Sequence, residues 1–167
     1  DVTYHGPGQL VGYPFLPLAS SGWTDANGEF VPMLDTIGYL RRLEKVLICA
    51  LAELGLPGCS TLQNLTGVWA PVQAESHGYA KIAAIGVKVN AQRVTTHGFA
   101  LNVNPVMRYW QGIISCGLAD RHVCSMAELL PNIPDMRLIV QAVSDAFGRE
   151  FGYRMVDGIY SEIPDFV

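Results

Sequence analysis

The feature that most limits how this chain can fold is the segment KIAAIGVKVNAQRVTTHGFALNVN, residues 81–104. Its apolar residues alternate with small or polar ones on both sides of a break at residues 90–93, which predicts two paired strands. One parity of the first strand holds Lys81, Ala83, Ile85, Val87 and Val89. Gly86 and Gly98 interrupt the strands, and glycine weakens a strand unless another backbone or a ligand comes close. The two glycines therefore predict that another backbone or a ligand comes close to this sheet.

Helices are predicted on both sides of these strands. Residues 33–55 form an amphipathic pattern that begins at Asp35 as N-cap and ends at Gly55. Its apolar stripe is Leu34, Ile37, Leu40, Leu43, Leu47, Leu51 and Leu54. The basic residues Arg41, Arg42 and Lys45 lie off this stripe and are expected on a solvated face. Residues 17–32, rich in Gly, Ser, Asn and Pro, are expected to form a surface loop.

The tail is predicted to be helical in two pieces. Ser125 and Glu128 have the spacing of a capping box. A longer helix is expected to begin at residues 134–135, with an apolar face of Met136, Ile139, Val140, Val143 and Phe147. Together with the strands, this order predicts one α+β domain over residues 1–167.

Composition limits the class of protein. Half of the residues are hydrophobic and 16% are charged, against roughly a quarter in typical domains, which favours a well-buried globular body. The net charge of −4 and the scattered basic residues argue against nucleic-acid binding. No apolar run reaches the roughly 18 residues of a membrane span. The four cysteines are irregularly spaced, so we interpret them as thiols in a reducing compartment.

Four places carry residues suited to chemistry: the turn at residues 5–9, Lys81, His97-Gly98 and Cys116-Gly117. A thiol beside a lysine or histidine is a common nucleophile, because a neighbouring cation stabilises the thiolate. Taken singly, each of these places has an ordinary structural explanation. Lys81 would then be a solvated lysine at a strand end, and the histidine a core residue.

A metal site is an open alternative. Cys116, His122 and Cys124 lie within nine residues, and His5 or His97 would supply a fourth ligand. The spacing matches none of the common zinc patterns, and we therefore expect no metal. The sequence also lacks a phosphate-binding loop and a glycine-rich dinucleotide fingerprint.

Taken in order, the motifs TYHGPGQLVGYP, LTGVW, KIAAIGVKV, TTHGFALNVN and SCGLADRHVCSM resemble the lipoyl(octanoyl) transferases. These enzymes are octanoyl-[acyl carrier protein]:protein N-octanoyltransferases, and the motifs follow the family's order and spacing over most of residues 1–126. The resemblance implies the fold of the biotin and lipoate ligase catalytic domains, a mixed sheet flanked by helices.

The resemblance also implies a reaction, the first step of lipoate biosynthesis, without a cofactor. Cys116 would take the octanoyl group from octanoyl-acyl carrier protein as a thioester. Lys81 matches the lysine that lowers the pKa of this cysteine and moves protons. The acceptors would be lysines of the lipoyl domains of 2-oxoacid dehydrogenases and of the glycine-cleavage H protein. The implied location is the cytoplasm, or the mitochondrial matrix in a eukaryote.

The family's substrate-binding positions fall on three stretches of this chain. Small residues there allow backbone N–H groups to approach the acyl carbonyl and its oxyanion, and apolar ones would line the octanoyl site. The implied residues are Asp1, Val2, Thr3, Tyr4 and His5, then Ala84, Ile85 and Gly86, then Gly98, Phe99 and Ala100. Gly6 and His97 are expected to support the same site.

The sequence departs from the family pattern in three ways. The family carries Arg-Gly-Gly before the opening motif, preceded by a strand-and-helix region, so we expect this chain to lack an N-terminal segment. Ser115 stands where a proline normally precedes the catalytic cysteine. Cys124 replaces a threonine, and we expect it to be a small buried side chain.

Other functions stay open at this point. An amidotransferase between lipoylated proteins would use the same cysteine with a different donor. An ATP-dependent lipoate ligase fits less well, because ligases of that type need no catalytic cysteine. A non-catalytic module that binds the acyl chain or its carrier is the alternative outside the enzymes.

Overall fold

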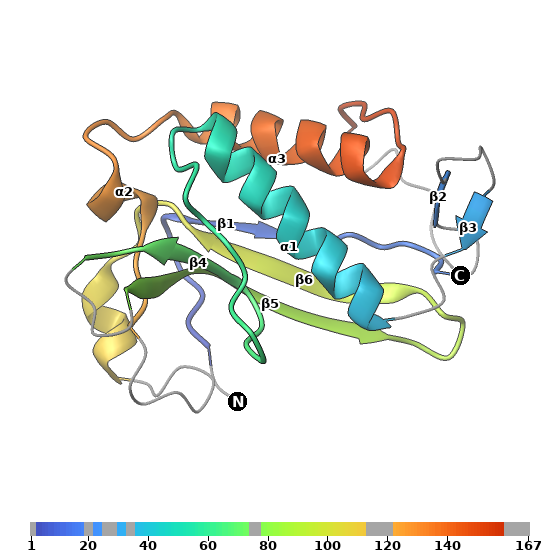
Figure 1. The fold of residues 1–167 in the computed structure, drawn as a ribbon, viewed down its shortest axis with the longest axis horizontal. Helices are drawn as coiled ribbons and strands as arrows, with labels where there is room; N and C mark the ends of the chain where they lie inside the picture. Colours follow the sequence, from blue (N-terminus) through green and yellow to red (C-terminus); the bar gives the residue numbers. More distant parts are fainter. Residues whose placement is uncertain are drawn as a thin grey trace.

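The computed structural model describes residues 3–18, 22–24, 30–32, 36–73, 78–112 and 122–158. These residues form a four-stranded sheet in the order β1-β6-β5-β4, with two long helices lying side by side over one face (Figure 1). The strands are β1 (Gln9–Gly12), β4 (Val68–Pro71), β5 (Tyr79–Val89) and β6 (Thr95–Asn102), all antiparallel to their neighbours. A single parallel bridge joins Lys81 to Val123. The predicted α+β fold with a helix-flanked sheet is confirmed.

The predicted pairing of residues 81–104 is also confirmed. β5 and β6 pair from Ala83 opposite Leu101 to Val89 opposite Thr95. Asn90 and Val94 close the turn between them through the Asn90 backbone and side chain. The expectation of a loop over residues 17–32 is wrong in part, because β2 (Gly22–Thr24) and β3 (Phe30–Pro32) pair as two short antiparallel strands.

A β-bulge in β5 overturns the predicted parity of that strand. Trp69 pairs with Lys81 and Val68 pairs with Ala83, so β5 advances two residues while β4 advances one. The adjacent residues Ile82 and Ala83 both belong to the hydrophobic core, although neighbouring side chains of a regular strand point to opposite faces. Lys81 is thereby directed to the face opposite Ala83, and the prediction that the two share a face is wrong.

Helix α1 (Thr36–Glu53) covers the core face of the sheet (Figure 1). Leu43, Leu47 and Leu51 of the predicted stripe are fully buried, joined by Tyr39, Val46 and Ala50. Ile37 is 68% exposed, so its assignment to the stripe is wrong. Gly55, in a left-handed conformation with φ of 98°, follows the end of α1 as predicted, whereas Asp35 lies outside the described residues.

The tail helices begin as predicted. The Glu128 carboxylate accepts hydrogen bonds from the Ser125 N–H and hydroxyl, at 2.9 and 2.8 Å, ahead of α2 (Met126–Leu129). The Asp135 carboxylate caps α3 (Met136–Phe151) by accepting from the Arg137 N–H at 2.8 Å. The predicted apolar face of α3 is only partly right. Ile139 and Val143 are buried and Phe147 packs on the core, but Met136 and Val140 are exposed.

Charged side chains join α1 to α3, and this corrects the expectation of a merely solvated basic face. Arg42 and Lys45 both contact the Glu150 carboxylate at 2.8 Å. Burial opposes ionisation of Glu150, but the hydrogen bonds from Lys45 and Arg42 outweigh it and lower the pKa of this carboxyl. Of the helices in the described residues, none is long and apolar enough to cross a membrane.

Candidate active site

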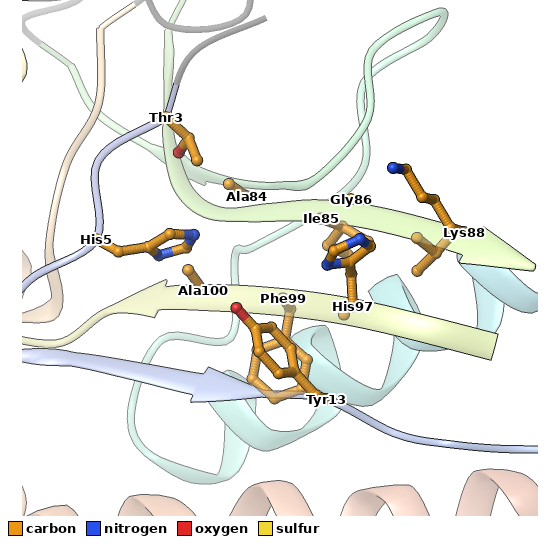
Figure 2. A pocket seen from close by; sticks show the side chains of 12 residues that line it. Thr3, His5, Tyr13, Ala84, Ile85, Gly86, Lys88, His97, Phe99 and Ala100 are labelled. Atoms are coloured by element: carbon orange, nitrogen blue, oxygen red, sulfur yellow. The ribbon is translucent and has the colours of Figure 1, made fainter.

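A pocket of about 400 Å³ opens on the sheet face that turns away from α1 and α3 (Figure 2). Three segments far apart in the sequence contribute to it: the chain on either side of β1, the middle of β5 and the middle of β6. Its lining residues are Thr3, His5, Tyr13, Ala84, Ile85, Gly86, Val87, Lys88, His97, Gly98, Phe99 and Ala100. The sheet thus keeps one face for the core and one for this pocket.

Most of the predicted site residues meet here. The lining includes Thr3 and His5 of the opening stretch, all of residues 84–86 and all of residues 97–100. Figure 2 shows the His5 and His97 rings on the same side of the sheet, above opposite ends of the pocket. Tyr4 does not line it, because its ring packs against Tyr109 and Trp110 with centroids 5.6 and 5.8 Å away.

Gly6 also lies outside the lining, and a Cβ there would meet the Tyr4 hydroxyl. Asp1, Val2 and Cys116 belong to the parts of the chain outside the described residues, as does Ser115. Their predicted roles therefore stay predictions.

The two glycines that interrupt the strands face each other in register but have different reasons for being glycine. A Cβ on Gly98 would lie 2.0 Å from the Gly12 carbonyl oxygen, so β1 can only approach β6 because that side chain is missing. A Cβ on Gly86 would meet nothing within 4 Å. Gly98 therefore serves the packing of backbones, whereas Gly86 keeps space open in the pocket.

Lys81 lies on the pocket face and is almost entirely buried. Its Nζ stands 4.9 Å from the centre of the Trp69 ring, within cation–π range. Its backbone N–H donates to the His122 carbonyl, and its carbonyl accepts from the Cys124 N–H, both at 2.9 Å. The chain that follows Cys116 by six residues thus returns to β5 beside Lys81.

Three lining residues were not predicted as site residues: Tyr13, Val87 and Lys88. The Tyr13 ring packs edge-on against His97 with centroids 6.2 Å apart. His97 holds a φ of 61°, unusual for a non-glycine residue. Val87 and Lys88 could have been found from the strand pattern, since they continue the stretch that contains Gly86. Tyr13 follows the turn at residues 5–9, and no pattern in the sequence indicated that the chain after this turn returns to the pocket.

None of the three cysteines in the described part of the chain lines the pocket. Cys49, Cys59 and Cys124 are reduced cysteines that form no disulfide. Burial raises the pKa of the Cys59 thiol to about 11, which disfavours its thiolate. Cys124 is buried with its Sγ 3.6 Å from the Ala80 carbonyl, in agreement with the prediction of a small buried side chain. Within the described residues, no three His, Cys, Asp or Glu side chains gather as metal ligands would.

Curated relatives match nearly all of this chain. An octanoyltransferase of Koribacter versatilis is 41% identical over 153 residues, covering 92% of this chain and 53% of the relative. An octanoyltransferase of Gloeobacter violaceus is 43% identical over 158 residues, covering 95% of this chain and 61% of the relative. The chain therefore spans between half and two thirds of the length of these relatives.

Solved structures share the fold at low identity. A bipartite lipoate protein ligase of Thermoplasma acidophilum aligns with a TM-score of 0.65 at 15% identity, over 95% of this chain and 57% of its own. The biotin protein ligase of Aquifex aeolicus aligns with a TM-score of 0.50 at 16% identity, over 86% and 52%. The family described as lipoyl protein ligase A/B catalytic domain matches residues 1–148. The chain belongs to this family of lipoyl protein ligase A/B catalytic domains.

Proposed function

We propose that this chain, as a single catalytic domain, transfers an octanoyl group to a lysine amine of a lipoyl domain through a thioester on Cys116. The donor is octanoyl-acyl carrier protein, and the acceptors are lipoyl domains of 2-oxoacid dehydrogenases and the glycine-cleavage H protein. The reaction is the first step of lipoate biosynthesis and takes place in the cytoplasm. The names of the 37–43% identical relatives support the type of reaction.

The observation that carries this proposal is the buried lysine on the pocket face of β5. A lysine is almost never fully buried unless it is paired, and here a bulge in the strand directs Lys81 away from the core. The pocket has a volume typical of small-molecule sites, which run from roughly 300 to 1,000 Å³. Lys81 is not one of its lining residues, but it precedes the lining residue Ala84 by three positions on β5. A buried amine on the same face of the sheet as a pocket suits a reaction that moves protons on an acyl group.

In the first step, Lys81 takes the proton of the Cys116 thiol, and the resulting ammonium stabilises the thiolate. The thiolate sulfur attacks the thioester carbon of the donor, and the bond from that carbon to the carrier's sulfur breaks. The departing carrier thiolate receives the proton from Lys81. One thioester replaces another, so this exchange is nearly balanced and needs no ATP.

In the second step, the acceptor's lysine amine attacks the acyl carbon. Neutral Lys81 accepts the proton that the nitrogen loses, and Cys116 leaves as a thiolate. The products are an amide and the same thiolate–ammonium pair that began the cycle. Backbone N–H groups near Gly86 and Gly98 are candidates to stabilise the oxyanion of both steps.

The acyl chain is expected to lie along the apolar part of the pocket. Ile85 and Phe99 are among its lining residues on the two central strands (Figure 2), although Phe99 also belongs to the hydrophobic core and Ile85 packs against that core. Each methylene removed from water contributes about 0.8 kcal/mol, so a C8 chain gains several kcal/mol over a C4 chain. This difference is large enough to select the acyl length.

The test is intact mass spectrometry after incubation with octanoyl-acyl carrier protein and no ATP. The expected result is one octanoyl adduct that hydroxylamine removes and that Cys116→Ala lacks. The Cys49→Ala variant, which removes an exposed thiol from α1, is the matched control and should retain the adduct. Addition of H protein should then move the octanoyl group onto its lysine.

Four results would contradict the proposal. An adduct that persists in Cys116→Ala would refute the nucleophile. A requirement for ATP would favour ligase chemistry, and octanoyl-H protein as a far better donor would favour an amidotransferase. Carrier binding without any covalent adduct would favour a binding module.

A further inference from the structure

Two side-chain amides link the two sides of the candidate site. Gln9 begins β1 and Asn102 ends β6, and the two residues face each other in register. The Gln9 Nε2 donates to the Asn102 Oδ1 at 2.8 Å. Asn102 is buried, so its amide groups need partners within the protein.

On one side, the Gln9 amide holds the chain that leads into the pocket. Its Oε1 accepts from the Gly6 N–H at 3.1 Å, and its Nε2 also donates to the Tyr4 carbonyl at 3.2 Å. These contacts bracket His5, which lines the pocket together with Thr3. The position of this pocket wall therefore depends on Gln9.

On the other side, the Asn102 amide holds the segment that flanks Lys81. Its Nδ2 donates to the Cys124 carbonyl at 3.0 Å. The Cys124 N–H in turn donates to the Lys81 carbonyl at 2.9 Å. One continuous set of hydrogen bonds thus runs from Gly6 through Gln9, Asn102 and Cys124 to Lys81.

We propose that Gln9 and Asn102 are positioning residues that couple the pocket wall at residues 3–6 to the segment at residues 122–124 beside Lys81. The pair sets the position of the pocket wall at residues 3–6 and the position of the segment beside Lys81 at the same time. Asn102 must accept on one atom and donate on the other, and only an amide of this length does both. The role in transfer rests on the function proposed above, whereas the coupling itself does not.

Asn102→Asp tests the role in the transfer reaction. The new carboxyl can still accept from Gln9, but it donates to the Cys124 carbonyl only while it is protonated. At pH values where this carboxyl is ionised, the transfer rate constant of Asn102→Asp, divided by that of the parent, should fall about tenfold for each unit of rising pH. Asn90→Asp is the matched control, because the Asn90 side chain accepts from Val94 and an ionised carboxylate does so too. The ratio of the Asn90→Asp rate constant to that of the parent should not change with pH.

Hydrogen exchange of backbone amides tests the coupling without any substrate. Gln9→Leu should lower the protection of the Cys124 amide at least tenfold, although Gln9 does not contact Cys124 in the bonds described. Asn102→Leu should lower the protection of the Gly6 amide in the same way. The Ser60 amide, which bonds to Trp69 at the far edge of the sheet, is the reference and should keep its protection.

The outcomes separate the possible failures. Unchanged protection at Cys124 in Gln9→Leu would refute the coupling, and so would an equal loss at Ser60. A third outcome combines loss of amide protection with a transfer rate of Asn102→Asp that keeps a constant ratio to the parent rate at every pH where circular dichroism shows the variant folded. It would mean that Gln9 and Asn102 have only a structural role, and it would refute their role in transfer. A parent chain that forms no octanoyl adduct would refute the proposed function, while hydrogen exchange would still decide the coupling.

Discussion

The two faces of the central sheet are made from the same two strands but obey different rules. The face under α1 and α3 is filled with apolar side chains such as Leu47 and Ile82. The other face keeps two glycines, a buried lysine and an open pocket. A dense core gains stability from every methylene, whereas the pocket face gives up packing to leave room for a ligand. The two faces should therefore respond differently to substitution, in stability on one side and in activity on the other.

The largest expected effect is on activity, from Lys81→Met. Methionine keeps much of the packing against Trp69 but cannot hold a proton, so the transfer rate should fall by about 100- to 10,000-fold. Lys45→Met, on the helix-covered side, is the matched control and should keep the parent rate. Steady-state transfer to H protein measures both, and a Lys81→Met enzyme within threefold of the parent would contradict the assignment.

Leu47→Ala should have the largest effect on stability. The side chain is fully buried between α1 and the sheet, and a cavity there should cost about 2–5 kcal/mol of unfolding free energy. Ile37→Ala, on the same helix but 68% exposed, should cost less than about 0.5 kcal/mol. Urea unfolding measures the two, and equal losses would mean that α1 does not pack as described.

The facing glycines give a smaller and more diagnostic effect. Gly98→Ala should lower the unfolding free energy by about 1–3 kcal/mol, because its methyl group would strike the Gly12 backbone. Gly86→Ala should leave stability within about 1 kcal/mol of the parent. Gly86→Leu should instead shorten the acyl chain that the pocket accepts. Unfolding curves and a series of C4 to C10 acyl carriers measure this, and an unchanged length preference would mean that the chain does not pass Gly86.

The smallest expected effect belongs to Glu150→Gln between α1 and α3. The folded-state pKa of Glu150 lies below its ordinary value of 4.5, so its ion pairs stabilise the fold above that pH and lose this effect as pH falls. The variant should be slightly less stable than the parent at pH 7, and the difference should shrink as the pH falls below 4.5. Thermal unfolding from pH 3 to 7 measures it, and a difference that grows in acid would reverse the sign argued here.

Much of this molecule was predictable because it depends on patterns within one segment. The strands of residues 81–104, the capping box at Ser125 and the end of α1 at Gly55 are all local. The family motifs also identified nine of the pocket's lining residues before their arrangement was known. In contrast, Ile37 was misassigned because the helical period does not say where the covering layer ends.

What sequence reasoning missed depends on partners that are distant along the chain. The bulge at Ile82 exists only relative to β4, and alternation read along β5 alone placed Lys81 on the same face as Ala83. The Gln9–Asn102 contact joins residues 93 positions apart. Neither feature produces a periodic pattern in the sequence, so neither could be predicted from the residues of one strand or one turn.

The bulge has a consequence for how the gene can vary. The extra residue at Ile82 allows Lys81 and Ala83 to face opposite sides of the sheet although they stand two positions apart in the sequence. Exchange of Ile82 for valine should be tolerated, since the site remains apolar. Loss of that single codon would bring Lys81 and Ala83 into regular alternation on the faces that they now occupy, so it would remove the buried Ile82 side chain without turning the lysine toward the helices. Loss of one residue from the regular part of the strand, such as Ala84, would instead turn the residues on one side of it to the other face. Along this stretch we therefore expect lineages to differ in length at the bulge before they do so anywhere else.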